Sequence, residues 1–363
     1  MTEAQATVRS TPLTESHTSA GAHLGVWFGA NLPDDFGDWR AEYRYARETV
    51  ALLDKNYRAY LDFAGPDRVR YLNAILTNNI KDLRENHGSV SLFLNPQGHI
   101  QAEIETYALP DRIFAVSFAM IRERLIEGLD KYIIMDDVTL TDRTEDFATL
   151  GLEGPQAASV AKDLTDINVA ALDELEIRDA RVDGIACRIT KRSPHGMTGA
   201  EFLVASGDAV ALWSRLQQAA RKIGGGPAGY VALNALRLEQ GIPWFGYDFG
   251  ERQIPHEAGL HDSHISYTKG CYTGQEIVER VRSRGQVNRT RVLLKLDAQE
   301  APTANSPLLS EGKELGYITR SGFSPALGSA IAMGYVRREK SAPGSQLSAK
   351  DDGVATVITS PVV

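Results

Sequence analysis

One of the two cysteines of the chain lies in the segment Lys269-Gly270-Cys271-Tyr272-Thr273-Gly274-Gln275-Glu276. The apolar residues that follow it recur at helical spacing and predict a helix over about 274–283. Thr273 and Glu276 stand three apart, the spacing of a capping box at a helix start. Cys271 would then lie near the positive end of the helix, where a thiolate is favoured. The segment predicts either a reactive thiol or a cysteine that packs in a glycine-rich turn.

A second candidate is an arginine at an apolar helix end, in Leu236-Arg237-Leu238-Glu239. Arg237 and Glu239 are two residues apart and point to different faces of a helix, so at least one of them is partly buried and needs a partner. Two interpretations stay open. Arg237 makes a structural ion pair, or it binds the carboxylate of a ligand.

Three histidines, His256, His261 and His264, lie within nine residues that also hold two acids. Their spacings of five and three match no standard zinc pattern, and Gly259 would interrupt a helix that aligned them. We therefore predict no metal site.

Basic residues gather between Arg280 and Lys295, where no acidic residue occurs. Such a run is usually a solvated face, but it could also bind an anionic tail or an RNA phosphate. The net charge of −8 argues against strong nucleic-acid binding by the whole surface.

The composition is that of a globular protein with two or three domains. The chain has 363 residues, 43% hydrophobic and 24% charged. No apolar run approaches the roughly 18–20 residues of a membrane span, and no secretory signal is recognisable, so we expect a cytoplasmic protein. The two cysteines, Cys187 and Cys271, are too few for a disulfide framework, a zinc ion or an iron–sulfur cluster. Cys187 alternates with arginine on a predicted strand and is expected in the core.

The elements that position these residues indicate an α+β fold. A strand, a Gly-Pro pair and a helix occur twice, beginning at Tyr60 and at Leu150, and indicate two related α+β subdomains. Between them, Asn95-Pro96-Gln97-Gly98 predicts a hairpin turn. A further helix is expected over 42–53.

The C-terminal part, from about residue 290, has short β-type runs separated by Gly, Pro and Ser, which predict an all-β module. We therefore divide the chain into a flexible N-terminal arm (1–22), an α+β body (23–289) and a C-terminal all-β module (290–363), which is a sandwich or a small barrel.

With these segments placed, the chain resembles the folate-binding superfamily that contains the glycine-cleavage T-protein (GcvT, an aminomethyltransferase) and the YgfZ-type iron–sulfur maturation proteins. The resemblance spans almost the whole chain. Segments 11–17 and 46–54 are similar to the opening of the T-protein, and 236–239 and 257–260 are similar to its central signature. The segment 269–276 is similar to the YgfZ signature.

The resemblance implies a ring of two related α+β subdomains and a C-terminal barrel around a hole that takes tetrahydrofolate. It makes Cys271 the reactive group, beside Lys269. A pterin needs flat walls and hydrogen-bond partners, and its glutamate tail needs basic groups. The candidate folate-binding residues are Tyr107, Met197, Arg237, Trp244, Arg280 and Arg291.

The chain departs from the T-protein at two acidic positions. The Asp-Asp pair after the Asn-x-x-Gly turn corresponds to Ala102-Glu103, and the glutamate of a Gly-Tyr-Thr-Gly-Glu segment corresponds to Ala200. Glu103 is therefore the candidate for the catalytic acid.

Three hypotheses follow. The leading one is a YgfZ-like, tetrahydrofolate-binding protein that supports iron–sulfur cluster assembly or repair, and thereby tRNA modification, with iron–sulfur client or assembly proteins as partners. The alternative is a tetrahydrofolate-dependent aminomethyltransferase, or a related demethylating enzyme, that uses Glu103. The third is a tRNA- or protein-binding module that uses the arginine run.

Overall fold

A computed structural model describes residues 8–193, 198–285, 287–298, 300–349 and 353–362. The chain divides into two compact units. Unit 1 contains the chain up to Leu72, together with Ile80–Ser89 and Ile104–Leu233, and unit 2 contains Asn73–Asn79, Val90–Glu103 and the chain from Asn234. Within the described residues, no helix has the length and apolar character that a membrane span requires.

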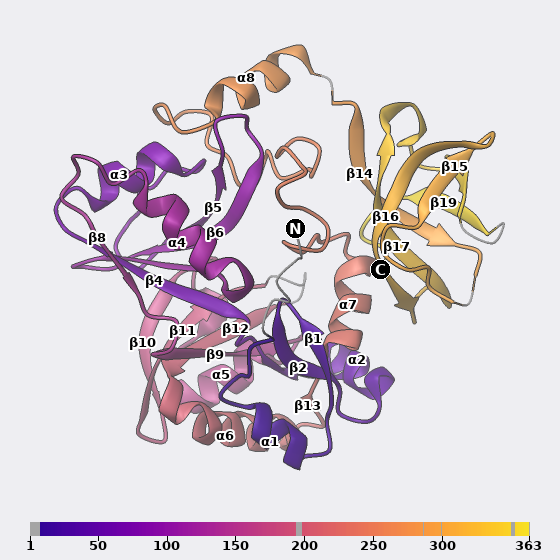
Figure 1. The fold of residues 1–363 in the computed structure, drawn as a ribbon. Coiled ribbons are helices and arrows are strands. Elements are labelled where there is room, and N and C mark those ends of the chain that lie inside the picture. Colours follow the sequence, from indigo (N-terminus) through magenta and orange to yellow (C-terminus); the bar gives the residue numbers. More distant parts are fainter. Residues whose placement is uncertain (1–7, 194–197, 286, 299, 350–352, 363) are drawn as a thin grey trace. The chain divides into compact units, whose positions relative to one another are not determined.

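Unit 1 is built on β-sheets with helices packed against them (Figure 1). The six-stranded sheet has the order β10 (Ile177–Val182), β11 (Ile185–Lys191), β12 (Gly199–Ala205), β9 (Phe147–Glu153), β3 (Ala51–Asp54) and β13 (Gly226–Pro227). The five-stranded sheet has the order β5 (Gly88–Leu94), β6 (Ile100–Ala108), β7 (Ile113–Phe118), β4 (Arg58–Ala64) and β8 (Thr139–Asp142), and the turn-side ends of β5 and β6 belong to unit 2. A hairpin of β1 (His23–Trp27) and β2 (Ala30–Asp35) is separate.

The helices of unit 1 bury their apolar faces on these sheets. Helices α5 (Ala157–Thr165) and α6 (Ala209–Lys222) pack on the six-stranded sheet and share one core with it. Cys187 lies in that core, as predicted, with 7% of its surface exposed. The remaining helices are α1 (Thr14–Ser19), α2 (Trp39–Glu48) and α4 (Arg122–Asp130), while α3 (Arg68–Ile75) and α7 (Tyr230–Glu239) run on from unit 1 into unit 2.

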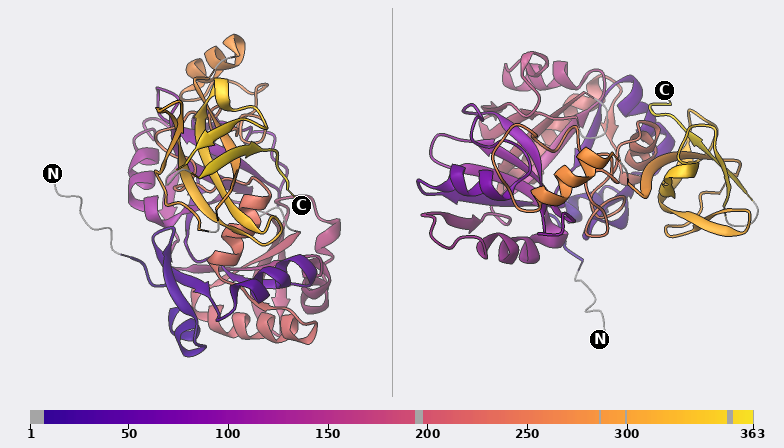
Figure 2. Two further views of the ribbon diagram at one scale, coloured as in Figure 1. Left: turned by 90° about the vertical axis from the view of Figure 1, so that its right-hand side faces the viewer. Right: turned by 90° about the horizontal axis from the view of Figure 1, so that it is seen from above.

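Unit 2 contains a closed β-barrel, drawn in orange and yellow in Figures 1 and 2. Its strand order is β14 (Arg289–Leu296), β17 (Ser329–Arg337), β16 (Lys313–Ser324), β15 (Pro307–Ser310), β18 (Gln346–Ser348) and β19 (Val354–Ile358). Aliphatic residues that alternate along the strands fill the barrel. Helix α8 (Gln275–Arg284) precedes the barrel in the chain.

The mixed α+β class and the C-terminal barrel are thus confirmed. The repeated strand–Gly-Pro–helix pattern is also confirmed, as β4–α3 and β9–α5. The glycine is required in both copies because its φ is +97° at Gly65 and +129° at Gly154. A β-carbon at Gly65 would also lie 2.2 Å from the carbonyl oxygen of Asp137. The division at residues 22 and 289, and the ring, stay predictions.

Two expectations about helices are wrong. The helix expected over 42–53 ends at Glu48, and Ala51–Asp54 form β3, with all four residues buried. A short apolar run that is buried on both faces does not distinguish a helix from a central strand. The capping box is also wrong: α8 begins after Gly274, which has a φ of +82° and no side-chain cap.

Candidate functional site

Residues 269–276, called the signature segment below, are held by Lys269 against the end of α3 and the residues that follow it. Lys269 Nζ donates hydrogen bonds to the carbonyl oxygens of Asn73 at 2.6 Å, Leu76 at 2.5 Å and Asn78 at 2.9 Å. An ammonium group has three protons, and a helix C-terminus presents carbonyls without partners inside the helix. Burial lowers the pKa of Lys269 to about 8. Lys269 therefore has an anchoring role, and its catalytic role stays a prediction.

Cys271 follows this anchor and is exposed, unlike Cys187. The residues after it are held close to the turn between β5 and β6. The N–H of Thr273 donates to Ala74 O at 3.2 Å, and a β-carbon at Gly274 would lie 2.7 Å from Asn95 O. The thiol of Cys271 is therefore exposed to solvent, while contacts of Lys269 before it and of Thr273 and Gly274 after it hold the backbone in place.

Glu103, near the middle of β6, is hydrogen-bonded to His264. Glu103 Oε1 lies 2.9 Å from His264 Nε2, and Ser263 Oγ lies 2.7 Å from His264 Nδ1. A carboxylate oxygen accepts, so His264 Nε2 is the donor to Glu103. Nothing in the sequence indicates this pair, whose members are 161 residues apart. Glu103, His264 and Ser263 form a continuous hydrogen-bonded group with a carboxylate at one end.

The contacts of Arg237 with the protein are those of a structural residue. Its side chain has no exposed surface and makes an ion pair with Asp248, as well as two hydrogen bonds to Asn234 Oδ1 at 3.0 and 2.9 Å. Its guanidinium lies 4.6 Å from the ring centre of Trp244. Burial lowers the pKa of Arg237, although Asp248 opposes this effect. The contacts fit the ion-pair interpretation, and folate binding by Arg237 and Trp244 stays a prediction.

The arginine run does not form one surface. Arg291 is partly buried and donates to the carbonyl oxygens of Ala258 at 2.7 Å and Gly241 at 2.9 Å. Arg280 is exposed on α8 and pairs with Glu276 at 3.2 Å. The proposed folate contacts of both arginines stay predictions.

Tyr107 belongs to unit 1 and is 3% exposed, with its hydroxyl donating to Glu105 Oε2 at 3.0 Å. Met197, the other candidate assigned to the pterin, lies outside the described residues.

Unit 1 also brings together the opening segments of the family resemblance. Asp54 accepts from Thr11 Oγ1 at 3.2 Å and lies 2.9 Å from His17 Nε2.

Glu105 is part of a buried ionic cluster that the sequence analysis missed. Glu201 bridges its cations, with 2.8 Å to Lys55 Nζ and 2.9 Å to Arg58 Nη2. Burial alone would raise the pKa of Glu201, but Arg58 and Lys55 outweigh it and hold the pKa at about 2. Three acids balance three bases; the members are Lys55, Arg58, Glu105, Glu153, Arg192 and Glu201.

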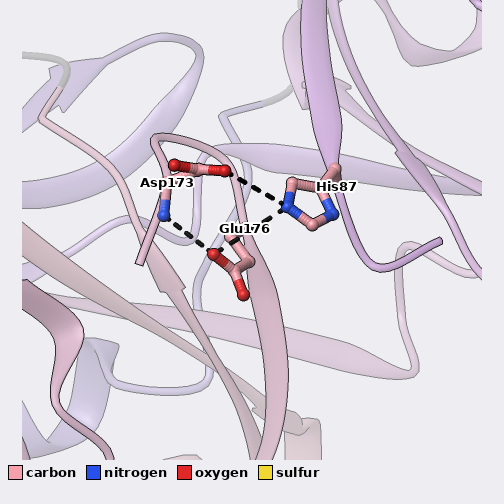
Figure 3. A group of neighbouring side chains, drawn as sticks. All are labelled: His87, Asp173 and Glu176. Atoms are coloured by element: carbon pink, nitrogen blue, oxygen red, sulfur yellow. Dashed lines mark hydrogen bonds and ion pairs between the residues drawn. The ribbon is translucent and has the colours of Figure 1, made fainter. Parts of the chain in front are cut away.

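Among the described residues, one group of side chains is compact enough to hold a metal ion: His87, Asp173 and Glu176 (Figure 3). His87 Nε2 lies 3.4 Å from Asp173 and 3.9 Å from Glu176. Both carboxylates already have arginine partners, since Asp173 accepts from Arg84 at 2.7 Å and Glu176 pairs with Arg178. We interpret the group as an ion-pair cluster.

Comparison with known proteins shows the class to which this fold and these residues belong. Residues 13–264 match the model of the GCVT N-terminal domain, and residues 289–363 match the glycine cleavage T-protein C-terminal barrel domain. The chain belongs to the glycine-cleavage T-protein family.

Individual relatives agree with this assignment. The chain is 31% identical over 333 residues to an aminomethyltransferase of Herpetosiphon aurantiacus, covering 91% of this chain and 90% of the relative. It is 29% identical over 336 residues to an aminomethyltransferase of Rubrobacter xylanophilus, covering 93% and 89%. The crystal structure of glycine cleavage system aminomethyltransferase T from Bartonella henselae has the same fold, with a TM-score of 0.89 over 98% of each chain at 24% identity.

The names of these relatives help to choose between the YgfZ-like hypothesis and the aminomethyltransferase hypothesis. They support the aminomethyltransferase alternative better than the YgfZ-like interpretation that we placed first.

We predict that Glu201→Gln destabilises the fold by about 3–5 kcal/mol, because it leaves buried cations without their shared carboxylate. The free energy of unfolding of the wild type should fall as the pH drops from about 4.5 toward 2, since Glu201 has a lowered pKa of about 2 in the folded state. This part of the pH dependence should be missing in the variant. Urea unfolding at several pH values measures both effects, with the exposed Glu123→Gln as control.

We predict that one thiol per chain reacts rapidly with an aromatic disulfide reagent in the native protein, and two in denaturant. Cys271 is exposed, whereas burial raises the pKa of Cys187 to about 11. Cys271→Ser should abolish the fast reaction. A fast reaction that persists in this variant would contradict the assignment.

Proposed function

We propose that the chain binds tetrahydrofolate and transfers a one-carbon unit, as an aminomethyltransferase or a related demethylating enzyme. One observation carries this proposal: the Glu103 carboxylate has a defined partner, His264 Nε2, at 2.9 Å. The aminomethyltransferase names of its relatives support the same class of reaction.

In this proposal Glu103 is the acid–base group. Forming methylene-tetrahydrofolate from an aminomethyl donor makes two bonds from the carbon to folate nitrogens and breaks its bonds to the donor atom and to the amine. One proton leaves each folate nitrogen, and the departing amine and the departing donor atom each receive one. Glu103 is suited to this exchange because its carboxylate can accept a proton while His264 holds its orientation. The side chain of Glu103 is 20% exposed, so the carboxylate is accessible and still partly screened from water. The resemblance to the T-protein implies an Asp-Asp pair at residues 102 and 103. Because residue 102 is alanine in this chain, Glu103 is the one acid of the pair.

The Glu103→Gln variant tests this role. Methylene-tetrahydrofolate formation from an aminomethyl donor should fall by about 100-fold or more, the range of a lost general acid–base group. Tetrahydrofolate binding should change far less, because glutamine has nearly the same shape. Absorbance of the folate product measures turnover, and Glu123→Gln is the control. Unchanged turnover in Glu103→Gln would contradict the assignment.

A second candidate function is favoured by the exposed thiol of Cys271 in the YgfZ-like segment. In this alternative the protein supports iron–sulfur cluster assembly or repair, and tRNA modification depends on it through iron–sulfur enzymes. The chain has only two cysteines, so a partner protein or the folate would have to supply further iron ligands.

Complementation separates the two functions. In cells without the native copy, Cys271→Ser should fail to restore the activity of iron–sulfur enzymes, whereas Cys187→Ala should restore it. Full restoration by Cys271→Ser would exclude a role for this thiol and leave the transferase proposal intact.

A further inference from the structure

Unit 2 contains a cavity of about 520 Å³ whose described lining includes none of Glu103, His264 and Cys271. Cavities of about 300–1,000 Å³ are the usual size for small-molecule sites. Its walls combine aromatic, apolar and basic groups, contributed by the loop before the signature segment, by α8 and by the chain after β17. The residues on which the argument rests are His256, His261, Tyr267, Arg282 and Arg338.

Flat rings form one wall. The imidazoles of His256 and His261 are stacked, with centres 4.9 Å apart and planes at 14°. Tyr267 continues this group, since its hydroxyl lies 3.3 Å from His256 Nε2. The guanidinium of Arg282 lies 4.1 Å from the centre of the Tyr267 ring. Flat aromatic and guanidinium groups of this kind are the surfaces on which planar heteroaromatic ligands stack.

The two histidines also have unused hydrogen-bonding atoms. Nδ1 of His256 and Nδ1 of His261 are buried, and neither has a hydrogen-bond partner among the described residues. Burial, assisted by His261, lowers the pKa of His256 to about 4, so this ring is neutral at pH 7. A buried polar atom without a hydrogen bond destabilises the protein. A ligand whose edge bonds these atoms would remove that cost.

The charge of the cavity favours an anion. Arg282 and Arg338 both line it, with Asp262 as the one acid among the described lining residues, and Arg282 also pairs at 3.5 Å with Glu279, which is outside that lining. A second hollow of about 570 Å³ also has Arg338 in its wall and adds Arg289 and Arg337. This concentration of arginine stands out in a chain with a net charge of −8. Guanidinium groups bind phosphate through paired, charge-assisted hydrogen bonds.

We propose that this cavity binds a small anion made of a planar heteroaromatic ring and a phosphate group, as in a mononucleotide. The ring stacks beside Tyr267 and the two imidazoles, and the phosphate binds Arg282 and Arg338. The proposal does not depend on one-carbon transfer. Glu103→Gln should therefore bind the ligand as the wild type does, so that either proposal can fail alone.

The test is a calorimetric titration of the full chain with AMP. We expect one AMP per chain, and binding at least about ten-fold weaker for adenosine and for inorganic phosphate, because each lacks half of the recognised groups. Arg282→Gln and Arg338→Gln should each weaken AMP binding by about ten-fold. Both side chains are exposed, so neither substitution threatens the fold. Arg252→Gln, an exposed arginine of unit 2 outside the residues that line the cavity, is the matched control.

A further titration distinguishes a free nucleotide from the end of a nucleic acid as the ligand. A short single-stranded RNA with a 5′-phosphate that binds more tightly than AMP would point to a nucleic-acid end, and weaker binding would point to the free nucleotide. The proposal would be overturned if titration with millimolar AMP produced no binding heat. AMP binding that is equal in the wild type, Arg282→Gln and Arg338→Gln would overturn it as well.

Discussion

The signature segment depends on one interaction, the ammonium group of Lys269 against three carbonyl oxygens at the end of α3. Further bonds join the same two stretches of chain. Thr77 Oγ1 donates to His264 O at 2.6 Å, and Ser266 N donates to Thr77 O at 3.1 Å. The loop that contains His264 and Cys271 is therefore fixed along its length to residues 73–78. This constraint gives His264 a defined position opposite Glu103 and holds the backbone of the exposed cysteine.

Unit 1 is organised around a different constraint, its buried ionic cluster. Six charged side chains balance one another, and burying them is costly unless every partner is present. The cluster lies on strands of both large sheets of unit 1, since Arg58 is on β4 and Glu201 is on β12. It therefore couples the two sheets through charge as well as through apolar packing. Tyr107 is tied to it by its hydroxyl, which gives this residue a structural role in addition to the one predicted for it.

The sequence was sufficient where local chemistry decides the structure. Gly65 and Gly154 fix their turns because only glycine adopts the required φ without strain, and the Asn95–Gly98 turn follows from the same kind of residue preference. The α+β class and the all-β character of the C-terminal module followed from strand and helix periodicity, and the barrel followed from the family resemblance.

Long-range pairs could not be predicted. Glu103 and His264 lie 161 residues apart, and nothing in either segment indicates the other. The boundary between α2 and β3 was missed because a strand buried on both faces has no alternation. The ionic cluster did leave one signal, since Glu201 interrupts the otherwise apolar strand β12. A charge at such a position requires a buried partner, although the sequence does not identify it.

We propose that this member of the glycine-cleavage T-protein family uses tetrahydrofolate, although Ala102 and Ala200 stand where the family resemblance implies acidic residues. The decisive measurement is a calorimetric titration of the full chain with tetrahydrofolate. We expect saturable binding of one tetrahydrofolate per chain, retained in Glu103→Gln. Absence of binding at high micromolar protein would contradict it.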